Sequence, residues 1–282
     1  MRRRSSQARR SWLSLIFALT ACKEQRAEPL PTPAETRALA DELCPQVARP
    51  LFFKIERDGL TSYVLGTRHV GVRFAKFPPE VEVAFRASKI AVFESIASAP
   101  DKPAALDREL GPARWAKLRA LVGPIEAERV RNSPAKAIAM LLTLFEDRSA
   151  FLDVELQELA RTRQMELVAL EDNKHGDHRA QELASPERLR KLLDSISGRE
   201  TLKAATESGL RSYCTAGSAQ PGDPSELDEV SEQRRRAWLT PLAMQLQRGQ
   251  VFVAVGAAHL AGPDGLPALL REQGFMVTDL SQ

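Results

Sequence analysis

Residues 63–72 read YVLGTRHVGV, an apolar run that ends in a glycine and is followed, three residues later, by a histidine. Residues 251–260 read VFVAVGAAHL and repeat this order near the other end of the chain. The chain has four histidines, and the two units place His69 and His259 just beyond two strand-like runs. The glycine of each unit lets the backbone leave a strand sharply, or approach another chain segment closely, because it has no Cβ. The repeated unit predicts two buried strands that each present a histidine at the edge of a sheet.

Two more strand-like runs end in acidic side chains. IAVF leads to Glu94, and LVAL leads to Glu171. Long stretches with helical spacing of apolar residues lie between the strand-like runs. This pattern is typical of an α/β protein, so we expect a central mixed, partly parallel sheet with a large helical insertion. Ligands of such sheets gather beyond the carboxyl ends of the strands, where residues that are distant in sequence converge.

The domain organisation follows from changes in composition along the chain. Residues 46–282 are expected to form one α/β domain, with helical insertions at about 103–160 and 185–248. Within this domain, RDGL (residues 57–60) joins two β-rich runs and contains the Asp-Gly pair that is typical of a tight hairpin. Residues 22–45 begin polar and proline-rich, and they predict a tether that runs into a short helix.

The first 21 residues predict a secretory signal peptide. They hold five arginines and no acidic residue, and they include an apolar run that is much too short to span a bilayer. LTAC, which ends at Cys22, resembles the bacterial lipobox, whose cysteine becomes the acylated N-terminus. An ordinary signal peptide with an incidental cysteine is the alternative. We expect a lipid-anchored protein of the bacterial cell envelope that faces the periplasm, with the outer membrane favoured because no aspartate follows Cys22.

The net charge bears on the class of partner. The whole chain carries +3, and loss of the five signal-peptide arginines leaves −2. The charge therefore gives no case for nucleic-acid binding.

Cys44 and Cys214 are the two cysteines that remain after Cys22. An exported protein meets an oxidising compartment, so we favour a disulfide between them. Two separate buried thiols are the alternative, because the sequence does not show whether the two residues approach each other.

Two histidines and a carboxylate at one edge of a sheet could bind a metal ion. Imidazole and carboxylate together suit Zn, Mn, Co or Fe, and a metal with open positions supports hydrolysis. The competing interpretation is that a histidine after a strand is simply hydrogen-bonded. A second stretch, HGDH (residues 175–178), could also bind a metal with neighbouring aspartates, although such a polar, glycine-containing loop is more often solvated.

Four stretches in this order resemble the TraB/GumN family, which is related to the Tiki metalloproteases. FFKIERDGLTSYVLGTRHVG resembles the family's opening hairpin and first G-x-x-H, and ASKIAVFES resembles the strand that carries its glutamate. FLDVELQELARTRQMELVALED resembles the helix and strand that end in Leu-Glu, and the stretch from EQRRRAWL to REQGFMV resembles the closing block. The resemblance covers about residues 46–282 and implies a metal-dependent peptidase.

The resemblance also implies roles for individual residues. His69, Glu94 and His259 would bind a divalent metal (Mn, Co or Zn), and Glu94 is also a candidate for proton transfer. Arg234 matches an arginine on the helix before the last motif and would stabilise an oxyanion, unless it is a solvated arginine on a helix face. Glu171 is a candidate to orient a ligand histidine, or else an acid of a helix cap or salt bridge.

Two residues depart from the family's pattern. Arg68 lies inside the first G-x-x-H, where an aliphatic or small residue is usual, and its charge would oppose a metal unless the side chain points away. Arg235 stands where asparagine is expected. Both residues put catalytic competence in question, but not the fold.

Taken together, the sequence predicts a membrane-tethered, metal-dependent hydrolase, with a Tiki-like peptidase as the first interpretation. Its expected partners are a peptide or small-molecule substrate and, through Cys22, a membrane; the number of subunits is not predicted. One alternative is a non-catalytic periplasmic lipoprotein that binds haem, iron or a peptide, as the related haem-binding lipoproteins do. Another is a small-molecule hydrolase similar to the related erythromycin esterases. The substrate-selecting surface is expected in the helical insertions.

Overall fold

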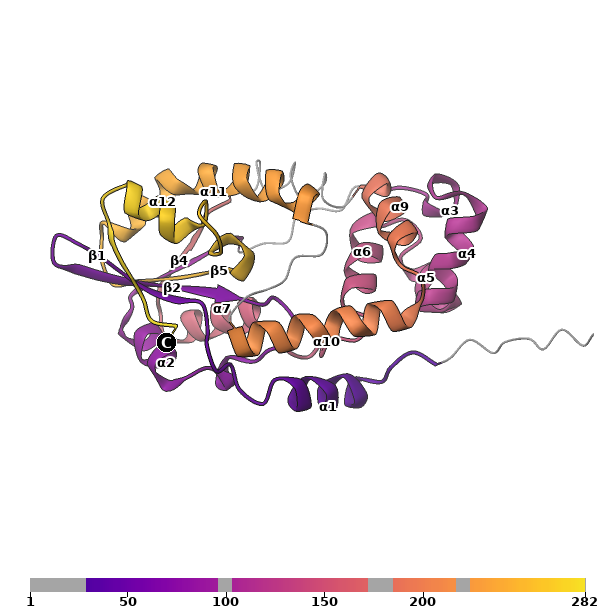
Figure 1. The fold of residues 1–282 in the computed structure, drawn as a ribbon, viewed down its shortest axis with the longest axis horizontal. Helices are drawn as coiled ribbons and strands as arrows, with labels where there is room; N and C mark the ends of the chain where they lie inside the picture. The colour runs from indigo at the N-terminus through magenta and orange to yellow at the C-terminus, as the bar shows by residue number, and fades with distance from the viewer. Residues whose placement is uncertain (1–28, 96–102, 172–184, 217–223, 282) are drawn as a thin grey trace, which may run out of the picture.

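A six-stranded mixed sheet forms the centre of the protein (Figure 1). The computed structural model describes residues 29–95, 103–171, 185–216 and 224–281. The strand order across the sheet is β4-β3-β5-β2-β1-β6. The strands are β1 (Phe52–Arg57), β2 (Leu60–Thr67), β3 (Ile90–Phe93), β4 (Glu166–Ala169), β5 (Val251–Gly256) and β6 (Met276–Asp279).

The middle of the sheet is parallel, and its strands follow the apolar runs of the sequence. β5 pairs in parallel with β2 on one side and with β3 on the other, and β3 pairs in parallel with β4. β1 pairs antiparallel with both β2 and β6. The turn between β1 and β2 consists of Asp58 and Gly59, which both have positive φ, as Asp-Gly pairs favour in two-residue hairpins. The predicted mixed, partly parallel sheet is confirmed.

Helices cover both faces of the sheet and form a separate bundle beyond one end of it (Figure 1). Ser133 caps α6 by accepting a hydrogen bond from the N–H of Lys136, as the Ser-Pro pair at this point predicts. The helices are α1 (Pro33–Leu43), α2 (Pro79–Ala87), α3 (Leu106–Glu109), α4 (Gly111–Val122), α5 (Pro124–Arg129), α6 (Pro134–Leu142), α7 (Leu152–Thr162), α9 (Pro186–Ser195), α10 (Arg199–Ala216), α11 (Pro224–Leu246) and α12 (Leu266–Glu272), with 3₁₀ turns η1 (Phe74–Lys76) and η2 (Ala257–His259).

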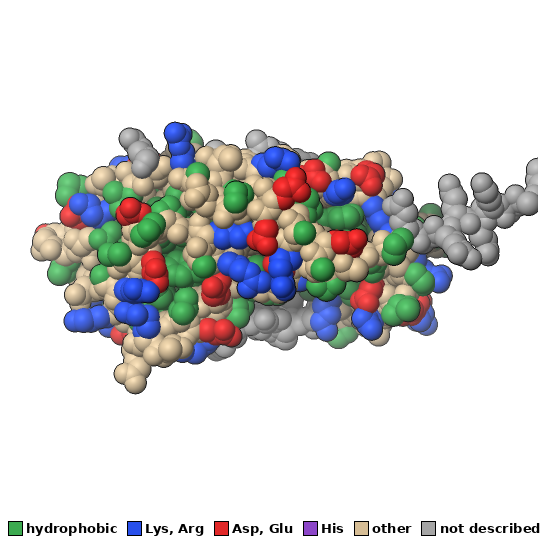
Figure 2. Space-filling model, turned by 90° about the horizontal axis from the view of Figure 1, so that it is seen from below, with side chains coloured by type: hydrophobic (Ala, Val, Ile, Leu, Met, Phe, Trp, Pro, Cys, Tyr) green, Lys and Arg blue, Asp and Glu red, His purple; other side chains and the backbone are tan. Residues whose placement is uncertain are grey.

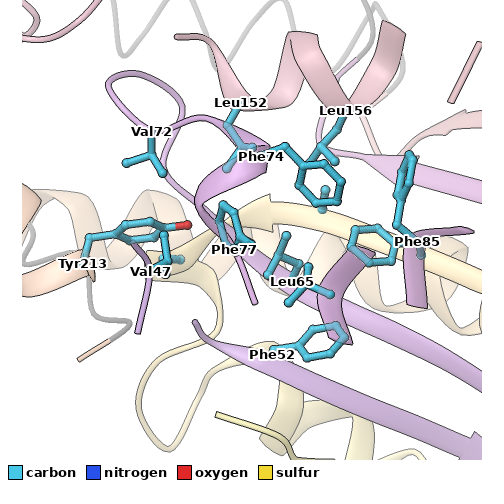
Figure 3. Close-up of a cluster of buried hydrophobic side chains, with 14 of the residues drawn as sticks. Val47, Phe52, Leu65, Val72, Phe74, Phe77, Phe85, Leu152, Leu156 and Tyr213 are labelled. Atoms are coloured by element: carbon cyan, nitrogen blue, oxygen red, sulfur yellow. The ribbon is translucent and has the colours of Figure 1, made fainter. Parts of the chain in front are cut away.

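Two apolar clusters fill the two faces of the sheet. On one face, strand residues such as Leu65 pack with Phe85 of α2, Leu156 of α7 and Tyr213 of α10 (Figure 3). The other face packs against α11 and α12, with Trp238 fully enclosed. β3 and β5 are buried along their whole length, because side chains alternate between two covered faces. The central strands are therefore held rigidly from both sides.

The bundle has an apolar core of its own, built by α3, α4, α5, α6 and α9. α10 belongs to both parts of the protein, since Leu202 packs in the bundle and Leu210 packs under the sheet. The insertions expected at about 103–160 and 185–248 therefore divide between the two parts. α7 and α11 direct their apolar residues to the sheet and not to the bundle.

A disulfide between Cys44 and Cys214 joins the segment after α1 to α10. The Cα atoms of the two cysteines are 5.6 Å apart, and both side chains are buried. Lys76 adds to this attachment, because its Nζ donates hydrogen bonds to the carbonyl oxygens of Ala40 and Cys44 and to the carboxylate of Asp41. The N-terminal helix is thus fixed to the domain at its C-terminal end.

On the surface shown in Figure 2, Lys and Arg side chains and Asp and Glu side chains are scattered in small groups among hydrophobic and other residues. None of the helices in the described ranges is long and apolar enough to cross a bilayer. The expected signal peptide (residues 1–21) and the expected lipidation site, Cys22, lie outside the described residues.

Replacement of both Cys44 and Cys214 by alanine is expected to lower the free energy of unfolding by about 2–5 kcal/mol. A bridge between residues 170 positions apart strongly restricts the unfolded chain. Chemical denaturation under oxidising conditions measures the difference. A reducing agent should destabilise the wild type and leave the double variant unchanged. Equal unfolding free energies for the two proteins would contradict a stabilising role of the bridge.

Candidate active site at the ends of the parallel strands

Three neighbouring strands bring the two motif histidines and Glu94 to one place. β2, β5 and β3 lie side by side in parallel, so their carboxyl ends meet at the same edge of the sheet. His69 follows β2, Glu94 follows β3, and His259 lies in η2 directly after β5. An ideal Cβ on Gly256 would lie 3.1 Å from Glu94 Oε1 and 3.4 Å from His69 Nε2. The same Cβ would lie 3.6 Å from His259 Cδ2, so all three side chains converge on this glycine.

The motif glycines are needed here because other atoms approach them closely. The N–H of Gly256 donates a 2.6 Å hydrogen bond to Glu94 Oε1 and fixes the carboxylate. The φ of Gly256 is −53°, a value open to any residue, so close approach and not backbone conformation favours glycine. Gly66 packs against the second unit, where a Cβ would lie only 3.1 Å from the Cα of Ala257. The two G-x-x-H units therefore contact each other directly.

Arg234 of α11 connects residues from three strand ends. Its Nη2 donates to Glu94 Oε2 and its Nε donates to Glu171 Oε1, both at 2.7 Å. Its Nη1 lies 3.3 Å from His259 Nε2. The guanidinium carbon lies 4.7 Å from the centre of the Trp238 ring, a cation–π contact that holds the plane in position. One planar cation therefore orders all of these groups, which the single ammonium of a lysine could not do.

Glu94 is held as a carboxylate. Burial by itself would raise the pKa of Glu94, but the positive charges of His69 and Arg234 and the N–H of Gly256 lower it to about 2. Glu94 is therefore ionised at neutral pH, which suits a ligand of a cation. The proton-transfer role suggested for Glu94 stays a prediction.

His259 is a buried, neutral histidine. The pKa of His259 is lowered to about 4. Burial is the largest cause, and together with the positive charges of Arg234 and Arg235 it outweighs the opposing effect of the negative charge of Glu94. Arg234 can only donate, so the Nε2 that it faces is the acceptor and the ring proton lies on Nδ1. This Nδ1 is buried and has no hydrogen-bond partner in the described part of the chain.

Asp153 of α7 is a site residue that the sequence analysis did not single out. Its Oδ2 is hydrogen-bonded to His69 Nδ1. A carboxylate on one ring nitrogen fixes the tautomer and orientation of a metal-binding histidine and leaves Nε2 for the metal. The expected orienting acid, Glu171, instead binds Arg234. In the sequence, the one indication of Asp153 is its position at the start of a helix. Its role depends on where α7 begins: the helix starts beside His69, and the N–H of Leu152 donates to the His69 carbonyl oxygen.

The Arg68 side chain points away from the candidate metal ligands. It forms an ion pair with the buried Glu146, and its guanidinium lies against Gly209 of α10. A Cβ at Gly209 would lie 3.2 Å from Arg68 Nη1, so the glycine leaves room for the arginine. The arginine inside the first motif therefore joins the site loop to the helical part and does not place its charge on the ligands.

A pocket of about 200 Å³ opens beside the strand ends. Phe93 and Ala254 give it apolar surface, and polar groups come from the residues of the site. The lining residues are His69, Phe93, Glu94, Ser95, Asp153 and Ala254. A larger hollow of about 370 Å³ lies at Ala120 and residues 197–201, and none of the candidate site residues lines it. The smaller pocket is therefore the one that can place a ligand against Glu94 and His69.

The donor types at the site fit a divalent metal, but the ligands are not preassembled. Glu94 keeps lone pairs beyond those used by Gly256 and Arg234, and His69 Nε2 faces the same region. His259 Nε2 is 3.6 Å from Glu94 Oε1, but it is also in contact with Arg234. In the described ranges, no three His, Cys, Asp or Glu side chains are grouped as a metal site. Ligation by both histidines and Glu94 would require Arg234 to release His259.

Buried polar side-chain atoms without a hydrogen-bond partner are concentrated around this site. Within the described residues, the set is Thr67 Oγ1, Arg68 Nε, Glu146 Oε2, Asp153 Oδ1, Arg235 Nε, Trp238 Nε1 and His259 Nδ1. An unpaired buried polar group typically costs about 1–3 kcal/mol. Five of these seven residues, Thr67, Arg68, Asp153, Trp238 and His259, end a strand, belong to the two motifs or contact the site residues.

Fold and site define an α/β protein with a His-Glu-Arg cluster at the ends of its parallel strands. The model of the TraB/PrgY/gumN family matches residues 51–279, which include every residue of this cluster. The chain therefore belongs to this family, as its motifs predicted. No curated protein and no solved structure matches the chain. The HGDH stretch at residues 175–178 falls within the family match but lies outside the described residues.

Asp153→Asn is expected to lower the pKa of His69 and to destabilise the protein mainly at low pH. Partial desolvation by the neighbouring side chains opposes charge on the half-exposed His69, but the hydrogen bond and charge of Asp153, with the charge of Glu94, raise its pKa. A raised pKa stabilises the fold below the unfolded-state value of about 6.5, and this contribution is lost as the pH rises through the folded-state pKa. Because 59% of the His69 side chain is exposed, the loss at pH 6 should not exceed about 1 kcal/mol.

NMR titration of His69 and urea denaturation at pH 6 and pH 10, both on metal-free protein, measure these effects. Glu158→Gln, at an exposed position on the same helix, is the control and should change neither. An unchanged His69 titration in Asp153→Asn would show that Asp153 does not act on this histidine.

Proposed function

We propose that this protein is a metal-dependent hydrolase whose active site is the cluster around His69, Glu94, His259 and Arg234. The observation that carries the proposal is the convergence of Glu94 Oε1 and His69 Nε2 on Gly256, with His259 Nε2 3.6 Å from the same oxygen. Zn, Mn and Co are the metals that suit imidazole and carboxylate donors. We propose a peptide as the substrate class, because the motifs resemble those of the Tiki metalloproteases.

His69, Glu94 and His259 would hold the metal. When bound, it would polarise the substrate carbonyl and lower the pKa of a water molecule. Asp153 supports this role of His69, since its contact with Nδ1 leaves Nε2 available. Glu94 supports it through its lowered pKa, since it need not lose a proton at neutral pH.

Arg234 is placed to stabilise the negative charge that develops on a carbonyl oxygen. Its orientation is fixed by Glu171 and by the Trp238 ring, so it needs little rearrangement during a reaction. Its Nη1, which contacts His259, becomes free to donate to an oxyanion once that histidine turns to another partner. Glu171 is thus a positioning residue for Arg234.

A non-catalytic ligand-binding site is the second candidate function. The observation in its favour is that Arg234 already neutralises Glu94 and contacts His259, while the metal ligands are not preassembled. A site of this kind would bind haem, iron or a peptide at the same edge without turnover.

Full-length protein in detergent, stripped of metal, is expected to bind one Zn, Mn or Co ion per chain. His69→Ala, His259→Ala and Glu94→Gln should each weaken this binding by more than about 100-fold, since even outer partners of metal ligands are typically worth about 10–100-fold. Isothermal titration calorimetry and elemental analysis measure the affinity, and a library of unmodified peptides measures hydrolysis.

The double variant His175→Ala/His178→Ala is the matched control, because it removes the other two histidines of the chain. It should bind metal as the wild type does. A wild type that binds no metal more tightly than its His69 and His259 variants would refute the proposal. Metal or haem binding without peptide turnover would instead favour the ligand-binding lipoprotein.

We also propose that the protein is anchored to a membrane through Cys22 and acts in the periplasm. The support is the order of basic residues, apolar run and LTAC at the start of the chain. α1 is attached to the domain near the disulfide at Cys44, and residues 23–32 lie between Cys22 and the first helix. The active site would then be held near the membrane surface.

Cys22→Ser is expected to move the protein from the membrane fraction to the soluble periplasmic fraction, because serine cannot carry a thioether-linked lipid. Cell fractionation shows the change, and mass spectrometry of the N-terminus shows whether Cys22 is acylated. Cys44→Ser/Cys214→Ser is the control and should stay in the membrane fraction. An unacylated N-terminus at another residue would contradict the anchor.

A further inference from the structure

Arg235 is a buried arginine beside the candidate active site, and it has no ion-pair partner among the described residues. The residue is 8% exposed, and its Nε is buried without a hydrogen bond to any described residue. The arginines on either side are paired: Arg234 with Glu94 and Glu171, and Arg236 with Glu232. No carboxylate in the described ranges forms an ion pair with Arg235. Three consecutive arginines thus have three different environments, and of these three the middle one alone lacks a carboxylate partner in the described part of the chain.

Two further buried donors near Arg235 lack an acceptor. Trp238 lies three residues further along α11, on the same side of the helix, and its Nε1 has no partner among the described residues. The Trp238 ring lies 4.6 Å from the ring of His259, whose protonated Nδ1 likewise has no hydrogen bond to a residue that the structure describes. Arg235 is close enough to His259 for its charge to lower the pKa of that ring. The three side chains together present three buried N–H donors, while the one acceptor among them, His259 Nε2, already faces Arg234.

This arrangement is unfavourable in the absence of an acceptor. A buried charge is costly unless it is paired, and the cost is larger than for a neutral polar group. The two acids of the site, Glu94 and Glu171, already bind Arg234. The group that fits is therefore negatively charged and carries oxygen acceptors.

We infer that Arg235, with the N–H groups of Trp238 and His259, forms a subsite for an oxyanion of the ligand, either a carboxylate or a phosphate group. The inference rests on the proposed function, because the ligand is the substrate held at the strand ends. It adds that this substrate carries an anionic group close to the reacting bond. The planar fork of an arginine can bind two oxygens of such a group at once.

Isothermal titration calorimetry on metal-free, full-length protein tests the subsite without metal or turnover. A failure of metal binding would therefore leave this test intact. The probes are N-acetyl-dialanine, its C-terminal amide and inorganic phosphate. We expect the acid or phosphate to bind at least about tenfold more tightly than the amide, since a hydrogen bond to a charged group is typically worth about that factor. The tighter of the two anions identifies the source of the oxyanion.

Arg235→Met removes the charge and should abolish the preference for the anion. It should leave the Tm of the ligand-free protein unchanged or higher, because a buried unpaired charge is lost. Arg235→Lys keeps a charge without the fork and should retain a weaker preference. Arg236→Met is the control, at a side chain that is 65% exposed and paired with Glu232, and should bind as the wild type does.

Three results would overturn the inference. The first is equal binding of acid, amide and phosphate by the wild type, or no binding of any of them. The second is an undiminished preference for the anion in Arg235→Met, or in Arg235→Lys if the methionine variant does not fold. The third is a lower Tm of ligand-free Arg235→Met, which would mean that Arg235 stabilises the fold.

Discussion

The parallel pairing of β5 with β2 on one side and β3 on the other is the constraint on which the candidate site depends. Parallel strands end at the same edge, so residues that are almost 200 positions apart in the chain meet there. The two motif glycines allow the strand ends to approach closely. Gly66 packs against the second G-x-x-H unit, and Gly256 contacts Glu94. A shift of β5 by one residue would turn every side chain to the opposite face and would separate His259 from its partners.

Of the two neighbouring arginines at this edge of the sheet, Arg234 is paired with carboxylates and Arg235 has no carboxylate partner among the described residues. Two carboxylates share Arg234, which keeps both acids and the guanidinium in fixed positions. Arg235 and the Trp238 indole have no such partners in the described part of the chain. Proteins tolerate buried unpaired groups chiefly where they meet a ligand or take part in a reaction, because elsewhere the loss of stability brings no gain. The imbalance therefore fits a site that is completed by an anion.

The site is also connected to the helical part of the protein. Arg68 lies one residue before His69, and its charge is directed to Glu146 and to the backbone of α10 at Gly209. α10 reaches from the bundle core to the cluster under the sheet, where the disulfide at Cys214 holds its end. The residue that seemed from the sequence to threaten metal binding is thus part of the junction between the two halves of the protein.

The sequence by itself determined the α/β class, the strand ends and the places of His69, Glu94 and His259 just beyond them, because alternation, turn residues and repeated motifs are local signals. That the three side chains meet was an expectation that depended on the order of the strands in the sheet. It left open the partner of Arg68, the role of Asp153 and the pairing within the run of three arginines. Tertiary structure decided these points, since each depends on which helix lies against which strand end. The role of a charged side chain cannot be read from the sequence, because it depends on whether packing places an acid, water or no polar group within hydrogen-bond distance.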